Sequence, residues 1–277
     1  EERPRNQVTH ASHGLYTRDG AHPDELLAVS KEQLLRYPTA RYHKGRATGV
    51  RRIEGGFEVE LDGTWQATRR LVLTTGFRSV FDGVGIEGIG ELYGRSVFPC
   101  PFCDGFELAD RTLAVFAGGM PAPMVVHYLV MIRTLSSSDL RLFTHGDPVD
   151  AELAEQLEAR GIPYFTERIA RLQADGTQLT GVVLEDGRRI PVGAGFLGTP
   201  HAEPSDSFAA VLGAELGEHP FGWPVVVTGE RGETTVDGLF AAGDLGNGFA
   251  GLAGAVGSGW LAGAGVVAAF AAERWHG

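Results

Sequence analysis

The stretch Leu113-Ala114-Val115-Phe116-Ala117-Gly118-Gly119-Met120-Pro121-Ala122 decides the fold class. Its first five residues are apolar and predict a buried strand, and the two glycines that follow indicate a tight turn. A proline is tolerated in the first turn of a helix, and we expect a helix over residues 121–135 followed by a strand over 140–143. This order predicts a β-α-β unit and therefore an α/β protein with a parallel sheet.

The same patterns extend in both directions along the chain. Further helices are predicted over 23–37, 151–160 and 251–274. Strands are predicted over 43–61 with a turn at Gly55-Gly56, near Trp65, and over 70–75, 168–174, 179–185, 188–192 and 239–242. We expect the domain that contains the β-α-β unit to close near Gly198.

Cys100-Pro101-Phe102-Cys103-Asp104-Gly105 holds both cysteines of the chain. The C-x-x-C spacing lets two thiols close a disulfide and reopen it by exchange, and Asp104 is placed to carry the proton of each step. A zinc site needs four ligands and no other cysteine exists, while a static bridge would close almost no loop. The motif predicts a redox centre formed by Cys100, Cys103 and Asp104, with no metal.

Composition narrows the class of protein. The chain has 277 residues, 40 glycines and 43% apolar residues, which suits a two-domain α/β protein. Its net charge of −11 argues against nucleic acid and anionic membranes as partners. We interpret the apolar stretch 249–270 as a buried helix and not as a membrane span. No signal peptide is visible, and a catalytic thiol pair suits a reducing cytosol, so we expect a cytoplasmic protein.

The cysteine hexapeptide, Thr74-Thr75-Gly76 and Leu239-Phe240-Ala241-Ala242-Gly243-Asp244 together resemble the low-molecular-weight thioredoxin reductases. Arg5-Asn6, His13-Gly14 and Arg18-Asp19-Gly20 resemble the branch that includes the dithiol oxidases of gliotoxin and holomycin biosynthesis, although those oxidases usually carry His where this chain has Asp104. The resemblance implies two Rossmann-like, three-layer nucleotide-binding domains, with an FAD domain (1–95 and 199–277) interrupted by a smaller NAD(P)-type domain (96–198).

The resemblance also implies an FAD site. Asp244, after Gly243, would bind a ribityl hydroxyl of FAD, and Thr75-Gly76 would pass close to the cofactor. Asn6 and His13 would line the flavin or substrate pocket. Each residue also has a simpler interpretation, because Asp244 could only cap a helix, Gly76 could only end a strand, and a loop histidine is often merely solvated. The same family places Cys103 towards the flavin and Cys100 towards the partner's sulfur.

The beginning of the chain lacks the strand and G-x-G-x-x-G loop with which members of this family start. A strand, a crossover helix and a second strand need about 30 residues, all before Glu1. We therefore expect that the sequence is a fragment, a mis-started frame or a chain whose beginning was not recorded, and that Glu1–Gly277 alone binds FAD poorly.

The NADPH site departs from the family pattern. Ala117 replaces the first glycine of the G-x-G-x-x-A fingerprint, and Pro121 removes one backbone N–H from the phosphate site. Thr144-His145-Gly146-Asp147 stands where the reductases present arginines to the 2′-phosphate of NADPH. NADPH is therefore disfavoured. The opposing interpretation is that Gly119 suffices and that Asp147 holds the ribose of NAD.

These observations predict an FAD-dependent thiol/disulfide oxidoreductase that exchanges electrons with the Cys100–Cys103 pair and is not driven by NADPH. The expected partner is a thioredoxin-like protein or a small dithiol or disulfide, with ferredoxin or O2 at the other end of the electron path. The alternatives are an NAD(P)H-dependent thioredoxin or disulfide reductase, and a degenerate flavoprotein that serves as a binding subunit. Like its relatives, the protein is expected to be a homodimer.

Overall fold

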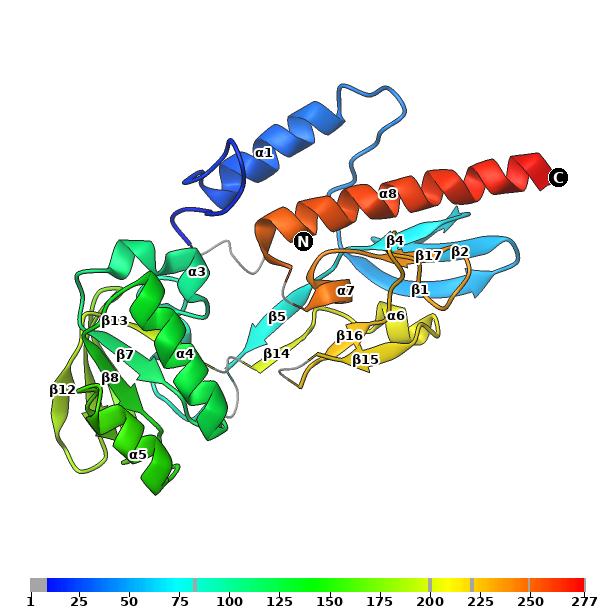
Figure 1. Cartoon of the computed structure of the whole chain (residues 1–277). Helices are drawn as coiled ribbons and strands as arrows, with labels where there is room; N and C mark the ends of the chain where they lie inside the picture. The colour runs from blue at the N-terminus through cyan, green and yellow to red at the C-terminus, as the bar shows by residue number, and fades with distance from the viewer. Residues whose placement is uncertain (1–8, 82–83, 199–200, 220–221, 249, 277) are drawn as a thin grey trace.

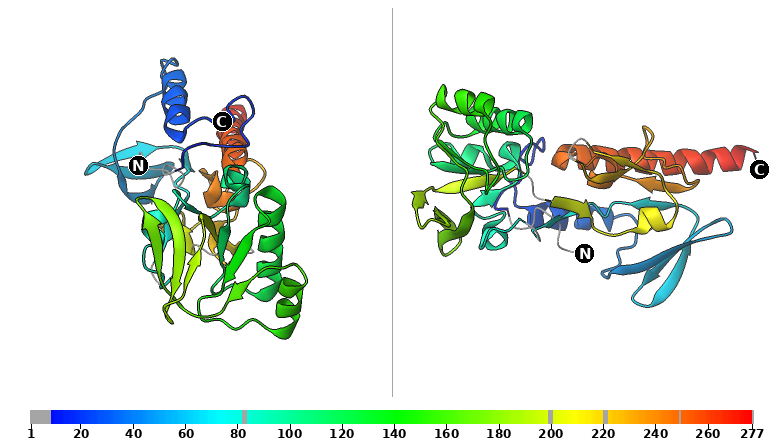
Figure 2. Two further views of the ribbon diagram at one scale, coloured as in Figure 1. Left: turned by 90° about the vertical axis from the view of Figure 1, so that its left-hand side faces the viewer. Right: turned by 90° about the horizontal axis from the view of Figure 1, so that it is seen from below.

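Two α/β lobes lie end to end in the computed structural model, which describes residues 9–81, 84–198, 201–219, 222–248 and 250–276 (Figure 1). The lobes are joined by two antiparallel strands, β5 (Phe77–Val80) and β14 (His201–Pro204). Figure 2 shows the same division from two further directions. One lobe is therefore inserted into the chain of the other.

The inserted lobe is built on a five-stranded parallel sheet of order β6-β13-β7-β8-β9. Its strands are β6 (Val97–Phe98), β7 (Leu113–Phe116), β8 (Leu140–Phe143), β9 (Tyr164–Phe165) and β13 (Ala194–Leu197). The elements that pack on this sheet are the helices α2 (Ile89–Leu92), α4 (Ala122–Leu135) and α5 (Ala151–Glu158) and the antiparallel strands β10 (Ile169–Asp175), β11 (Gln178–Leu184) and β12 (Arg189–Pro191). Helices, parallel sheet and antiparallel sheet form three layers, and the predicted α/β class is confirmed.

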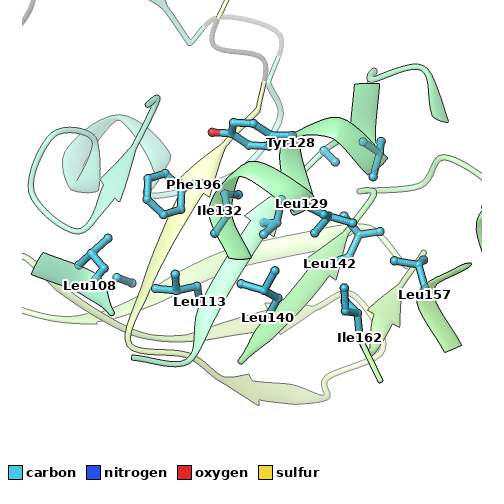
Figure 3. Close-up of a cluster of buried hydrophobic side chains, with 14 of the residues drawn as sticks. Leu108, Leu113, Tyr128, Leu129, Ile132, Leu140, Leu142, Leu157, Ile162 and Phe196 are labelled. Atoms are coloured by element: carbon cyan, nitrogen blue, oxygen red, sulfur yellow. The ribbon is translucent and has the colours of Figure 1, made fainter. Parts of the chain in front are cut away.

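Strand β7 shows how the sequence builds these layers. Alternate side chains of a strand point to opposite faces of its sheet. Leu113 and Val115 accordingly pack against α4 and α5, where Ile132 is fully buried (Figure 3). Ala114 and Phe116 pack on the other face, against the antiparallel strands. All four β7 residues are buried because the strand is covered on both faces, as its apolar sequence predicts.

Besides the joining pair, the described residues of the other lobe form three small sheets, of three, two and two strands, beside long helices. Its remaining elements are β1 (Ala47–Ile53), β2 (Gly56–Leu61), β3 (Thr64–Thr68), β4 (Leu71–Leu73), β15 (Leu216–Glu218), β16 (Pro224–Val226), β17 (Leu239–Ala241), α1 (Pro23–Leu34), α6 (Phe208–Val211), α7 (Asp244–Asn247) and α8 (Gly251–His276). Strands β1, β2 and β3 form an antiparallel meander, and β17 pairs in parallel with β4. The pair β4-β17 places two loops at one sheet edge.

Helix α8 departs from the expectation that it is buried. Only 11% of its most apolar window is buried, and Trp260 is 73% exposed. The physical reason is that α8 meets a two-stranded sheet on one side only, through Ala262 and Gly265, while its far end pairs Glu273 with Arg69 and Arg70. By length and composition α8 is apolar enough to cross a membrane. Because so little of the helix is buried, burial gives no argument against a membrane span.

Candidate active site

The two cysteines lie at the start of a short helix that contacts α4. Helix α3 (Pro101–Asp104) begins after Cys100, whose carbonyl accepts the backbone N–H groups of Cys103 and Asp104 at 3.1 and 3.2 Å. Neither cysteine is in a disulfide. Cys100 is buried and Cys103 is exposed, which is the reverse of the accessibility expected if Cys100 exchanges with a partner. The difference arises because Cys100 precedes the helix and lies close to buried Tyr128, while Cys103 is on the outer turn.

Cys100 is set up as a nucleophile. A hydrogen bond from the Cys103 side chain lowers the pKa of the Cys100 thiol, and the backbone N–H groups of Cys103 and Phe102 lower it further. Burial and the charge of Asp104 raise that pKa, but the hydrogen bonds outweigh them. Because the thiolate is the reactive form, the lowered pKa increases the fraction of Cys100 able to attack a disulfide near neutral pH.

Asp104 is held as a proton carrier. Burial raises the pKa of its carboxyl to about 6, and the charge of Glu107 raises it as well. A hydrogen bond from the Thr9 hydroxyl, 3.1 Å from Oδ1, and the charge of His13 act in the opposite direction. A carboxyl that titrates near 6 can both donate and accept a proton at physiological pH, which is what thiol–disulfide exchange requires.

His13 belongs to this cluster. Its Nδ1 lies 3.2 Å from Asp19, and its Nε2 lies 2.7 Å from Glu107, on the 3-10 helix η1 (Phe106–Leu108). Burial lowers the pKa of His13, but the hydrogen bond to Asp19 and the charges of Glu107 and Asp19 raise it to a net value above the ordinary one. His13 therefore contacts Glu107, which follows Asp104 by three residues in the chain. Asn6, the other residue expected at this pocket, lies outside the described residues.

The residues expected to bind FAD meet at one sheet edge. Because β4 and β17 are parallel neighbours, with Leu73 opposite Ala241, Thr75-Gly76 and Gly243-Asp244 leave the same edge. Gly76 has φ 62° and Gly243 has φ 71°, a left-handed conformation that glycine adopts freely. The Gly243 N–H donates to Ser258 Oγ of α8 at 2.9 Å, which fixes the turn.

This edge fits the FAD that the fold implies. Two glycine turns leave the backbone open at the carboxyl ends of adjacent parallel strands, where α/β sheets hold nucleotides. No atom lies within 4 Å of the place a Gly76 Cβ would take, and the half-buried Asp244 offers a carboxylate. Asp244 would hold a hydroxyl of the cofactor, with Thr75, Gly76 and Gly243 lining its path.

The glycine loop of the inserted lobe is closed by a carboxylate. Asp147 Oδ2 accepts the backbone N–H of Gly119 at 2.6 Å, which is the group that a dinucleotide phosphate would take. Helix α4 begins Ala122-Pro123, after Pro121, so two of its first amide positions lack an N–H. The N–H of Met124 already donates to Pro121 at 2.9 Å. Few donors therefore remain for an anion.

The neighbouring loop, residues 144–147, has a positively charged side chain beside it. His145 has φ 53° and its Nδ1 accepts the N–H of Ile169 at 3.0 Å, while burial and the charge of Arg168 lower its pKa. Arg168 lies against Gly146 and is 3.8 Å from Glu185. A cation therefore does reach this loop, from the residue directly before β10, which lies beyond the segment in which the sequence pattern would place it.

Comparison with known proteins agrees with this geometry. The family model described as pyridine nucleotide-disulphide oxidoreductase matches residues 21–259. The chain therefore belongs to this family. Its class, a flavin-dependent disulfide oxidoreductase of thioredoxin reductase type, is confirmed at that level.

Three relatives mark its place within the family. Thioredoxin reductase tcpT of Claviceps purpurea is 29% identical over 94% of this chain and 82% of its own length. A putative thioredoxin reductase, TrxB, from Bacillus anthracis has TM-score 0.89 and 30% identity over 98% of this chain and 88% of that chain. The crystal structure of HlmI has TM-score 0.86 and 28% identity over 99% of this chain and 84% of that chain. Another match, to a probable thioredoxin reductase of Arthroderma benhamiae, spans only 35% of that protein's length.

Several residues at these sites escape the sequence patterns. Thr9 and Glu107 lie in no motif, and only the fold brings them to Asp104. Ser258 lies in an apolar helix, and its polar hydroxyl is the sequence feature that could have indicated a hydrogen bond there. Pro123 could have been found from the sequence, because a second proline in the first helical turn removes a second amide donor.

Proposed function

We propose that the protein is an FAD-dependent thiol/disulfide oxidoreductase that exchanges electrons with the Cys100–Cys103 pair and takes them from, or gives them to, a carrier other than NADPH. The observation that supports this best is the cluster around α3: a Cys100 thiol of lowered pKa, an exposed Cys103, and Asp104 with a pKa of about 6. The three groups supply a nucleophile, an accessible second sulfur and a proton carrier.

Cys100, Cys103 and Asp104 have different roles in thiol–disulfide exchange. Cys103 is open to a partner in this conformation, and Cys100 lies behind it, ready to close the intramolecular bond. When a thiol attacks the Cys100–Cys103 disulfide, Asp104 accepts its proton and then returns it to the departing cysteine thiolate. Bound FAD supplies a two-electron couple for the pair, and the edge formed by Gly76 and Asp244 would hold it.

The closed glycine loop supports the part of the proposal that concerns NADPH. A carboxylate at the Gly119 amide repels phosphate and occupies its donor, and the prolines at 121 and 123 remove others. Arg168 favours the second candidate, an NAD(P)H-dependent reductase, because it could pair with a phosphate at the loop. The two candidates differ in whether a pyridine nucleotide reduces the flavin.

The surface beside the cysteines suits a partner with apolar surface. Phe102 is 65% exposed and Phe106 is 84% exposed, on either side of Cys103. A thioredoxin-like protein or a small apolar dithiol or disulfide could cover them during exchange. A homodimer through the exposed apolar side of α8, and a cytoplasmic location, whose reducing environment suits a thiol pair that cycles between the reduced and disulfide forms, complete the proposal.

The test combines thiol variants with a nucleotide challenge. Cys100→Ser and Cys103→Ser should each abolish disulfide turnover while bound flavin is retained, and full activity in either variant would remove the mechanism. Anaerobic mixing of the FAD-loaded protein with NADPH or NADH should bleach the flavin slowly. Fast stoichiometric bleaching by either nucleotide would establish the reductase candidate instead.

A further inference from the structure

We propose that His13 and Glu107 are positioning residues for proton transfer: their ion pair, together with the Thr9 hydrogen bond to Asp104, holds the N-terminal segment against the redox motif, and their charges set how readily Asp104 releases the proton exchanged with the cysteine sulfur. The inference rests on the proposed thiol–disulfide function and adds residues that lie outside the cysteine motif.

The geometry joins two distant parts of the chain at Asp104. His13 is on the N-terminal segment, anchored by Asp19, which also accepts the Gly14 N–H at 2.9 Å. Glu107 follows Asp104 by three residues and meets His13 Nε2 at 2.7 Å. Thr9, on the same segment as His13, donates to Asp104 Oδ1 at 3.1 Å. The segment is therefore attached to the redox motif at two adjacent points.

The charges of the pair act on Asp104 in opposite directions. Glu107 disfavours the Asp104 carboxylate and raises its pKa, while protonated His13 favours the carboxylate and lowers it. The other groups that face the cluster are Asp19, which raises the pKa of His13, and Cys100, whose pKa the Asp104 charge raises. Near pH 6 His13 carries its charge, because its own pKa is raised.

The proton step that the pair serves balances within the site. As a partner thiol attacks, one sulfur–sulfur bond forms, the Cys100–Cys103 bond breaks, and the partner's proton passes to the Asp104 carboxylate. The released cysteine leaves as a thiolate and takes that proton from Asp104. Both halves are fastest when Asp104 gains and loses a proton with equal ease at the working pH.

A titration of Asp104 itself tests the pair without turnover. In the full chain labelled with carboxyl-13C aspartate, the Asp104 signal is assigned by its loss in Asp104→Asn. Glu107→Gln should move the Asp104 titration to lower pH, and His13→Asn should move it to higher pH, each by about half a unit or more. Glu152→Gln, an exposed change on α5, is the matched control and should move nothing.

Opposite shifts separate positioning from mere support of the fold. Shifts in one common direction, or none, would overturn the inference, as would a Glu152→Gln variant that moves Asp104 equally. The acid limb of the pH profile for disulfide turnover should likewise move to lower pH in Glu107→Gln and to higher pH in His13→Asn. If the cysteines prove inactive, turnover is lost in every variant while the opposite shifts remain, so failure of the proposed function is distinguishable from failure of this inference.

Discussion

Replacing Asp104 by Asn should stabilise the protein, and more so as the pH rises. Burial moves the pKa of this carboxyl from 3.8 to about 6. The folded protein therefore keeps the proton over an interval in which the unfolded chain has lost it, so the free energy of unfolding falls as pH rises through that interval. A shift of about 2 units corresponds to about 3 kcal/mol at most, and partial exposure reduces it to about 1–3 kcal/mol.

Asparagine carries no charge at any pH and can still accept the Thr9 hydrogen bond. Urea unfolding of the wild type and Asp104→Asn at pH 5 and pH 8 should show a larger advantage for the variant at pH 8, by about 1 kcal/mol. Asp110→Asn, an exposed change nearby, is the control and should show no such dependence. An advantage independent of pH, or a variant less stable at pH 8, would refute the assignment of a buried, proton-holding carboxyl. Disulfide turnover should fall about 100-fold.

The remaining predictions concern the hydroxyl at the site and helix α8. Thr9→Val should raise the pKa of Asp104 further, seen by carboxyl NMR, because it removes a hydrogen bond that favours the carboxylate; Thr9→Ser should not. Gly265→Ala should destabilise the protein, because the added Cβ meets a backbone oxygen at 2.9 Å, whereas Gly263→Ala has open space and should stabilise it by about 0.5–1 kcal/mol; thermal unfolding distinguishes them. Trp260→Glu should convert a dimer to a monomer in light scattering; an unchanged mass would place the interface elsewhere.

Most secondary structure was predictable because the apolar periodicity of this chain is strong. Strand β7 and helix α4 follow directly from Leu113–Ala122, and the glycine pairs mark their turns where the structure has them. Helix α8 was predicted by position but not by environment. Glycine and alanine are compatible with burial on every side, and only the fold reveals that a two-stranded sheet covers one side.

The candidate site was predictable where its residues are adjacent in sequence. Cys100, Cys103 and Asp104 share one hexapeptide, so their proximity needs no fold. The Asp147 contact with Gly119 and the Thr9 contact with Asp104 join residues 28 and 95 positions apart. Such contacts depend on loop geometry, and no periodicity or spacing rule specifies it.

The most direct test of the central claim is an anaerobic reductive titration of the FAD-loaded protein with dithionite. If the Cys100–Cys103 disulfide is a redox centre in exchange with the flavin, the wild type should take up two more electrons per chain than Cys100→Ser before reduction is complete. Equal uptake by the two proteins would contradict the account, because the cysteine pair would then hold no electrons that the flavin can reach.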